Sequence, residues 1–322
     1  MLDVVSIGSA TLDVFLRSPG MEIETDETEK EICVRYGAKL EVNEIFFESG
    51  GGGTNTAVTF ARQGLSAASV VQVGDDFSGK KILEDLKKEG INIEFANVQK
   101  GMYTDYSTIL WAPDGGRTIL IYRGKTKLGV GDIAWDRLAT KWFYLSSTEG
   151  ELEIVKKVAS FSSVKIAWNP GSRELKQKEE LLAILPKISV FNVNKEEMEG
   201  LVNQGKTAET PQLLLLAQKL PCRWVVITDD KRGAYLWSKE EGSWVHAGIF
   251  EDTPRVETTG AGDAFGSGLV TGLIKGESME NCLYLASANA SSNVSVEGAK
   301  KGLLKTEDLE NWPKEKLAIR RL

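Results

Sequence analysis

Short runs of β-branched and aromatic residues alternate with amphipathic helical patterns along most of this chain. The runs occur at Val4–Ile7, Ser69–Val73, Trp142–Leu145, Val164–Trp168, Val190–Val193 and Trp224–Thr228. Between them, apolar residues recur at helical spacing in Ser78–Glu89, Glu151–Phe161 and Gln212–Leu220. Parallel strands need helical crossovers between them, and those helices bury both faces of the sheet. The sequence therefore predicts an α/β protein with a doubly wound, mostly parallel sheet and helices on both faces.

Two regions interrupt this alternation, within about residues 14–48 and 103–123. Alternating apolar and polar residues, as in Thr108–Trp111 and Thr118–Ile121, are typical of strands that expose one face. The turn-forming residues Pro113–Gly116 separate these two segments. We expect a small antiparallel β-sheet inserted into the α/β core.

This inserted sheet has three possible uses: a lid that excludes water from a reaction, a dimer surface, or both. Apolar residues on one face, Ile32, Val34, Val42 and Ile45, favour a homodimer formed through the lid. No repeat or low-complexity linker divides the chain, so we expect a single domain over residues 1–322.

The composition excludes several classes of function. A net charge of -7 disfavours a nucleic-acid or anionic-membrane partner, although a small anionic ligand can still bind backbone amides. No apolar run is long enough to span a membrane, and the N-terminus has no basic region, so a cytoplasmic location is expected. The single histidine, His246, lies in an alternating strand pattern, so carboxylates and backbone amides must carry any acid–base chemistry.

The segment Thr258–Phe265 places two glycines and a carboxylate at a predicted helix start. Backbone N–H groups at a helix N-terminus lack partners within the helix and carry the positive end of its dipole, so they bind anions such as a phosphoryl group. Asp263 lies in the first turn, where it can take a proton from an attacking hydroxyl. The alternative is that Asp263 only stabilises the helix dipole.

A second glycine-rich segment, Gly50–Asn55, precedes another predicted helix. Its glycines let the backbone approach a polyhydroxylated ligand closely, and Asn55 supplies both a donor and an acceptor. Composition alone equally allows a flexible hinge. Asp13, shortly after the first strand, either accepts hydrogen bonds from sugar hydroxyls or caps a turn.

Asn194 and Glu197 follow the apolar run Val190–Val193, at the edge where open α/β sheets bind ligands. Their spacing places both on one side of a starting helix, which suits a water-coordinated magnesium ion. A capping pair at the helix start is the alternative.

Together, these segments resemble the PfkB (ribokinase-like) family of carbohydrate and nucleoside kinases, from the first strand almost to residue 300. Both family signatures and two shorter motifs are present in order. The residues that carry the resemblance are Gly8, Ser9 and Asp13, Gly50–Asn55 with Gly64 and Gly74, Asn194 and Glu197, and Thr258–Phe265.

The resemblance implies an ATP-dependent, magnesium-requiring kinase with Asp263 as the base that deprotonates the acceptor hydroxyl. The backbone amides of Gly260, Ala261 and Gly262 are then the anion hole for the transferred γ-phosphoryl group. The implied acceptor positions are Asp13, Gly51, Gly52 and Asn55, the implied nucleotide positions are Asn194, Thr228, Gly233 and Asn289, and Glu197 is implied to hold Mg²⁺ through water.

Three departures from the family pattern bear on the substrate and the cation. Glu257 stands where the family usually has Asp, at a position associated with a monovalent cation, so K⁺ is a candidate cofactor. Gly52 replaces the lysine usual in ribokinases, which weakens ribose as the specific acceptor. Asp229 and Asp230 follow the nucleotide-site threonine, where their charge disfavours phosphate unless they face solvent or a cation.

We expect the acceptor to be the hydroxymethyl group of a small sugar, as in ribokinases and fructokinases. A nucleoside kinase of the same family is the alternative, because Gly101–Tyr106 supplies aromatic side chains that can stack on a base. An NAD-dependent oxidoreductase is disfavoured, because Gly8-Ser9-Ala10 lacks the dinucleotide fingerprint. A catalytically silent sugar-binding protein is disfavoured by the intact Gly260–Asp263 turn.

Overall fold

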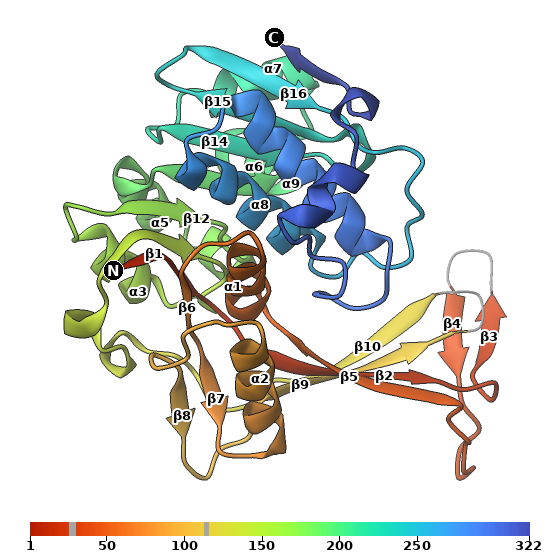
Figure 1. Cartoon of the computed structure of the whole chain (residues 1–322). Helices are drawn as coiled ribbons and strands as arrows, with labels where there is room; N and C mark the ends of the chain where they lie inside the picture. Colours follow the sequence, from red (N-terminus) through yellow and green to blue (C-terminus); the bar gives the residue numbers. More distant parts are fainter. Residues whose placement is uncertain (26–29, 113–115) are drawn as a thin grey trace.

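The computed structural model describes residues 1–25, 30–112 and 116–322 and contains one large and one smaller sheet (Figure 1). The large sheet has the parallel strands β1 (Leu2–Ile7), β6 (Ala67–Val70), β11 (Thr140–Leu145), β12 (Lys165–Trp168), β13 (Val190–Asn194) and β14 (Trp224–Thr228). The strands β15 (Ala234–Ser238), β16 (Ser243–Ala247) and β17 (Ile319–Arg321) extend it in antiparallel fashion. Their order is β17-β16-β15-β14-β13-β12-β11-β1-β6.

Helices cover both faces of this sheet. One layer contains α3 (Leu152–Ala159), α5 (Lys178–Ile184), α6 (Lys195–Val202) and α7 (Thr210–Ala217), and the other contains α1 (Gly52–Arg62), α8 (Ala261–Lys275) and α9 (Met279–Val294). Successive side chains of a strand point to opposite faces, so Phe143 packs in the first layer and Trp142 and Tyr144 in the second. The predicted doubly wound arrangement is confirmed.

The smaller sheet projects from one side of the α/β body and is called the lid (Figure 1). It consists of β2 (Thr11–Arg17), β5 (Glu44–Gly50), β9 (Asp105–Trp111) and β10 (Arg117–Tyr122), in the order β10-β9-β2-β5. The outer pairs are antiparallel and the central pair β2–β9 is parallel. A hairpin of β3 (Glu22–Thr25) and β4 (Lys30–Cys33) lies at its far end. Strands β9 and β10 lie within the expected region 103–123, whereas β2 begins before and β5 ends after the expected region 14–48.

One predicted strand is divided in two. The run Ser69–Val73 begins in β6, but after Val70 the chain leaves the large sheet and forms β7 (Gln72–Gly74), which pairs with β8 (Asn97–Gln99) beside α2 (Phe77–Lys88). The division follows from pairing, because β6 is an edge strand and β8 offers β7 a parallel partner of its own. Within the predicted turn Pro113–Gly116, residues 113–115 lie outside the described part of the chain.

The connections between the two sheets place the glycine-rich segments. From β1 the chain enters lid strand β2 through Gly8–Ala10, and it returns from β5 directly into α1 through Gly51. The two connections lie next to each other and are joined by a hydrogen bond from the Gly53 amide to the Ser9 carbonyl at 3.0 Å.

In the described ranges, none of the helices is both long enough and apolar enough to cross a membrane.

Candidate functional site

Two helix starts meet at the base of the lid. The Nδ2 of Asn55, in the first turns of α1, donates to Oδ2 of Asp263, in the first turn of α8, at 2.9 Å. The Oδ1 of Asn55 is buried, and no donor among the described residues reaches it. A buried acceptor without a partner costs free energy, so this oxygen is suited to accept a hydrogen bond from a bound hydroxyl.

Glycine at position 52 leaves room for this contact. A Cβ at Gly52 would lie 2.6 Å from Ser146 Oγ and 3.1 Å from Asp263 Oδ1, so a side chain there would displace both groups. Gly51 has φ of 92°, in the region that favours glycine. The absence of a lysine at position 52 thus has a local cause in the packing against Asp263. Ser146, at the end of β11, was not singled out from the sequence because a lone serine carries no pattern.

Helix α8 begins with Gly260 in the left-handed conformation, at φ of 77°. The Ala261 amide donates to the Thr258 carbonyl at 3.2 Å. In the described ranges, no protein acceptor is bonded to the amides of Gly260, Gly262 and Asp263. The turn therefore leaves backbone donors beside Asp263, as expected for anion binding.

Burial raises the pKa of the Asp263 carboxyl, and the hydrogen bond from Asn55 and the charge of Lys300 oppose this shift. Asp13, on β2, is 7% exposed, and burial also raises its pKa, with hydrogen bonds from Ser107 and Thr11 acting against the rise. A Cβ at Gly50 would lie 2.3 Å from Asp13 Oδ2. Asp13 and the Gly50–Asn55 loop therefore lie together, as the sequence predicted.

A cavity of about 190 Å³ lies beside the α8 turn. Thr228 and Gly233 border it from the large sheet, and Ala261 and Gly262 border it from α8. Its other lining residues are Asp230, Gly248, Ile249, Phe250, Thr253, Arg255, Thr258, Phe265, Ser287, Ala290, Ser291 and Val294. A pocket with apolar walls and a helix N-terminus at one end suits a nucleotide, with the base between apolar groups and the phosphates at the helix.

The two acids after Thr228 are both neutralised by arginines. Asp229 accepts two hydrogen bonds from Arg232, at 2.7 and 2.6 Å, and Asp230 accepts one from Arg255 at 2.9 Å. Their negative charges therefore do not stand unpaired at the cavity.

Asn194 and Glu197 form a reciprocal capping box at the start of α6. The Glu197 amide donates to Asn194 Oδ1 at 2.8 Å, and the Asn194 amide donates to Glu197 Oε2 at 2.9 Å. The capping alternative is thus present in the structure. Burial raises the pKa of Glu197. No group of three or more His, Cys, Asp or Glu side chains in the described part of the chain is arranged to hold a metal ion.

Asn289 lies apart from the cavity. Its side chain is fully buried; Nδ2 donates to the Ala264 carbonyl at 2.8 Å, and Oδ1 accepts from the Leu304 amide at 2.8 Å. Both polar atoms of the amide therefore hold protein segments together. Its neighbours in α9, Ser287, Ala290 and Ser291, line the cavity instead, because a helix turns successive side chains by about 100°.

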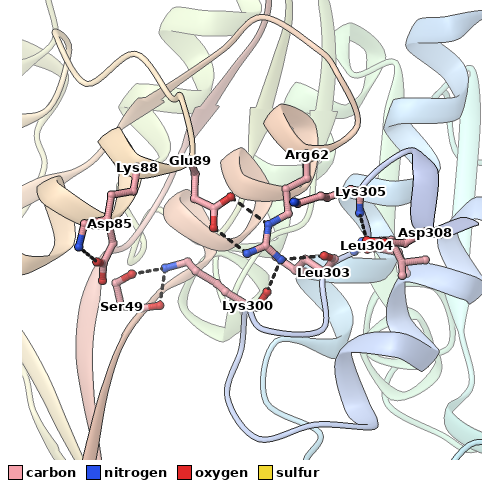
Figure 2. Close-up of polar contacts among 11 residues, drawn as sticks. Ser49, Arg62, Asp85, Lys88, Glu89, Lys300, Leu303, Leu304, Lys305 and Asp308 are labelled. Atoms are coloured by element: carbon pink, nitrogen blue, oxygen red, sulfur yellow. Dashed lines mark hydrogen bonds and ion pairs between the residues drawn. The ribbon is translucent and has the colours of Figure 1, made fainter.

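Lys300 reaches the site from a loop after α9, and no sequence motif pointed to it. Its Nζ donates to Ser49 Oγ at 2.8 Å and to the Ser49 carbonyl (Figure 2). Arg62 fixes the backbone of this loop by donating to the carbonyls of Lys300 and Leu303, at 2.8 and 2.7 Å (Figure 2). Burial lowers the Lys300 pKa to about 7 although the charges of Asp13 and other carboxylates oppose the shift. Only the fold brings this ammonium near the acceptor loop.

Glu257 is 3% exposed and is already paired with a cation from the lid. Its Oε1 accepts from Arg117 Nη1 at 2.7 Å and from Thr259 Oγ1 at 2.6 Å, and its Oε2 accepts from the Gly298 amide at 3.0 Å. Arg117 was also not singled out from the sequence, since it lies far from Glu257 along the chain.

The chain is similar to known proteins in sequence and in fold. The model of the pfkB family carbohydrate kinases matches residues 1–306. A ribokinase of Arabidopsis thaliana is 26% identical over 310 residues, which cover 92% of this chain and 77% of the relative.

Two solved structures share the fold. The Arabidopsis thaliana ribokinase complexed with ribose and ATP has a TM-score of 0.78 at 22% identity and covers 97% of this chain and 98% of its own. The Methanocaldococcus jannaschii nucleoside kinase, described as an archaeal member of the ribokinase family, has a TM-score of 0.76 at 21% identity. The match covers 98% of this chain and 99% of the nucleoside kinase. The family match over nearly the whole chain therefore shows that this protein belongs to the pfkB family of carbohydrate kinases, which phosphorylate sugar or nucleoside hydroxyl groups.

Proposed function

We propose that this kinase transfers the γ-phosphoryl group of ATP to a hydroxymethyl group of a small sugar. The observation that carries the proposal is the contact between Asn55 and Asp263, which joins a glycine-rich acceptor loop to a carboxylate at an open helix N-terminus. The acceptor lies on the lid side of this contact, next to Asp13, Gly51 and Gly52. The nucleotide occupies the cavity bordered by Thr228 and Gly233.

The polar groups beside the acceptor loop favour a sugar over a nucleoside. A cavity of about 20 Å³, enough for about one water molecule, adjoins Gly8–Ala10 and has a mostly polar lining. The other lining residues are Gln72, Asp105, Thr126, Leu128, Ser147, Thr148 and Glu149. Sugar hydroxyl groups can hydrogen-bond to polar side chains of this kind, whereas a nucleobase needs apolar or aromatic walls.

The proposed reaction is an in-line displacement. Asp263, in its ionised form, takes the proton of the acceptor hydroxyl as the oxygen attacks the γ-phosphorus, and the bond to the β–γ bridging oxygen breaks to release ADP. The free amides of Gly260, Gly262 and Asp263 donate to the equatorial phosphoryl oxygens, on which negative charge is greatest during transfer. Asp263 here takes the place of Ala261, the third donor expected from the sequence, because the Ala261 amide is already bonded to the Thr258 carbonyl. Asn55 holds the carboxylate of Asp263 in position throughout.

Magnesium is proposed to arrive with ATP. Mg²⁺ retains several waters and binds through phosphates and one or two carboxylates, and no preformed metal cluster exists among the described residues. Glu197 is the carboxylate proposed for a contact through water, with Asn194 as its capping partner. When bound, the ion would neutralise charge on the β- and γ-phosphates.

Replacing the proposed base tests the assignment of Asp263. Asp263→Asn retains an oxygen that can accept from Asn55 but cannot take a proton, so we expect turnover to fall by a factor on the order of 10² or more. Coupled-assay kinetics measure this loss, and an unchanged melting temperature establishes that the variant is folded. Near-normal turnover would exclude Asp263 as the base.

Removing the charge of Lys300 is expected to change the pH profile. Its positive charge favours the ionised form of Asp263, so Lys300→Met raises the pKa of Asp263 and moves the acid limb of kcat to higher pH, by about half to one unit. Because the Lys300 pKa is about 7, the difference is expected below that pH and vanishes above it. Lys301→Met, which removes an exposed partner of Glu48, is the control. Superimposable pH profiles of kcat for the parent protein, Lys300→Met and Lys301→Met would contradict an effect of Lys300 on the pKa of Asp263.

A phosphotransfer screen distinguishes the two acceptor classes. ADP release is measured with ribose, fructose, adenosine, cytidine and inosine at matched concentrations of ATP and Mg²⁺. The polar cavity beside Ser9 and Asp105 leads us to expect activity with a sugar. Activity with nucleosides alone would replace the sugar assignment with the nucleoside alternative.

We also propose that the lid forms a homodimer. Ile45 and Phe47 of β5 and Leu120 and Tyr122 of β10 lie on one face of the lid and are 44–57% exposed. Near its far end, Val34 and Val42 are also exposed, whereas Ile32 is half-buried. Apolar faces of this kind are usually covered by a partner.

Sedimentation of two matched variants tests the dimer. A double substitution, Ile45→Lys with Leu120→Lys, places charges in the proposed interface and is expected to yield monomers at micromolar concentration, while the parent protein sediments as a dimer. Leu215→Lys is the control, because Leu215 is 59% exposed on α7, far from the lid in sequence and outside its sheet. A monomeric parent protein would contradict the proposal.

A further inference from the structure

Glu257 is a buried carboxylate close to the start of helix α8. It directly precedes Thr258 and Thr259, which lead into the left-handed Gly260 and the start of α8. A buried charge is tolerated only when a counter-charge and hydrogen bonds compensate for lost hydration. Whatever supplies the positive charge beside Glu257 therefore also sets the geometry of the anion-binding turn.

The structure supplies that charge from the lid. Arg117 is the first residue of β10, which lies at the edge of the lid sheet and pairs with β9. Its Nη1 donates to Glu257 Oε1 at 2.7 Å, and its Nη2 donates to Thr258 Oγ1 at 3.2 Å. The guanidinium thus contacts two consecutive residues of the segment that enters α8, and its side chain is 29% exposed.

Most oxygens around Glu257 already accept hydrogen bonds. Besides the three donors bonded to its carboxylate, the Val294 carbonyl accepts from the amides of Val256 and Glu257, at 2.8 and 3.1 Å. The Thr259 carbonyl accepts from Asn293 Nδ2 at 3.1 Å. Two buried oxygens of neighbouring residues, Glu48 Oε2 and Asn293 Oδ1, have no partner in the described part of the chain. Arg117 nevertheless already supplies the positive charge beside Glu257 that K⁺, the cofactor considered for this position, would supply.

We propose that the Arg117 guanidinium replaces a dissolved monovalent cation beside Glu257, so that the anion-binding turn of α8 responds to the position of the lid instead of to K⁺. Arg117 acts here as a positioning residue, through Glu257 and Thr258. When the lid lies against the core, the guanidinium neutralises Glu257 and fixes Thr258 and Thr259. When the lid moves away, Glu257 loses its counter-charge and the turn loses two of its hydrogen bonds. The effect on catalysis rests on the proposed kinase function, whereas the pairing itself does not.

The melting temperature of the protein without substrates tests the pairing independently of the reaction. It is measured in the chlorides of potassium, sodium and tetramethylammonium at equal ionic strength. We expect the parent protein to melt at the same temperature in all three, because Arg117 already compensates the charge of Glu257. A melting temperature that is selectively higher in potassium chloride would overturn the proposal.

Variants of the pair sharpen the test. Arg117→Met leaves Glu257 buried and unpaired, so we expect the melting temperature to fall by about 5–10 °C in tetramethylammonium chloride and to recover partly in potassium chloride. Adding Glu257→Gln removes the unpaired charge, so the double variant should regain stability and lose the response to potassium. Arg137→Met removes an exposed arginine paired with Glu94 and is the control, with no expected response.

Two results from these variants would refute the proposal. The first is an Arg117→Met protein as stable as the Arg137→Met control, since the guanidinium would then not compensate Glu257. The second is a double variant that still responds to potassium, since the ion would then bind elsewhere. If Arg117→Met does not fold, Glu257→Gln alone takes its place: it should fold and show no response to potassium, and a response would place the ion elsewhere.

The same proteins are assayed for turnover with an accepted substrate. We expect the parent enzyme to be independent of potassium and Arg117→Met to be about tenfold slower in tetramethylammonium chloride, with partial recovery in potassium chloride. A parent enzyme activated by potassium would refute the inference. Absence of phosphotransfer to every acceptor would instead refute the proposed function, and the melting temperatures would still decide the role of Arg117.

Discussion

The hydrogen bond from Asn55 to Asp263 is the contact on which the rest of the site depends. It joins the starts of α1 and α8, so it sets the distance between the acceptor loop and the anion-binding turn. Glycine at residue 52 accommodates this contact, since a Cβ there would crowd Asp263 and Ser146. Close approach of two helix N-termini thus explains both the glycines and the absence of a lysine at this position.

Several buried carboxylates lie close together at this site, and their negative charges must be compensated. The compensating cations come from residues outside the two glycine-rich motifs. Lys300 is directed toward Ser49 by a loop that Arg62 holds, and its charge acts on both Asp13 and Asp263. Arg117 reaches Glu257 from the lid. In each case the compensating cation belongs to a loop or a lid strand, and not to the segment that carries the acid. Charge balance therefore links the core, the lid and the loop after α9.

Much of the fold follows from local pattern. Strand–helix alternation predicted the parallel sheet, and period-two alternation predicted the lid, because burial on two faces and on one face leave different sequence signatures. The division of Ser69–Val73 between β6 and β7 was missed, since a continuous apolar run does not show where its pairing partner changes. Asn289 was expected at the nucleotide, but the rotation of α9 turns its amide into the core and exposes Ser287 and Ser291 to the cavity.

By itself, the sequence determined the glycine-rich loop, the Gly260–Asp263 turn and their order along an α/β chain, because backbone conformation and helix-start chemistry are encoded within a few residues. Only the tertiary structure decided which charges meet. Lys300 and Arg117 are ordinary basic residues in the sequence, and their partners Ser49 and Glu257 lie far away along the chain. Long-range electrostatic pairing depends on how the lid and the loop after α9 pack against the core, and no local spacing records that packing.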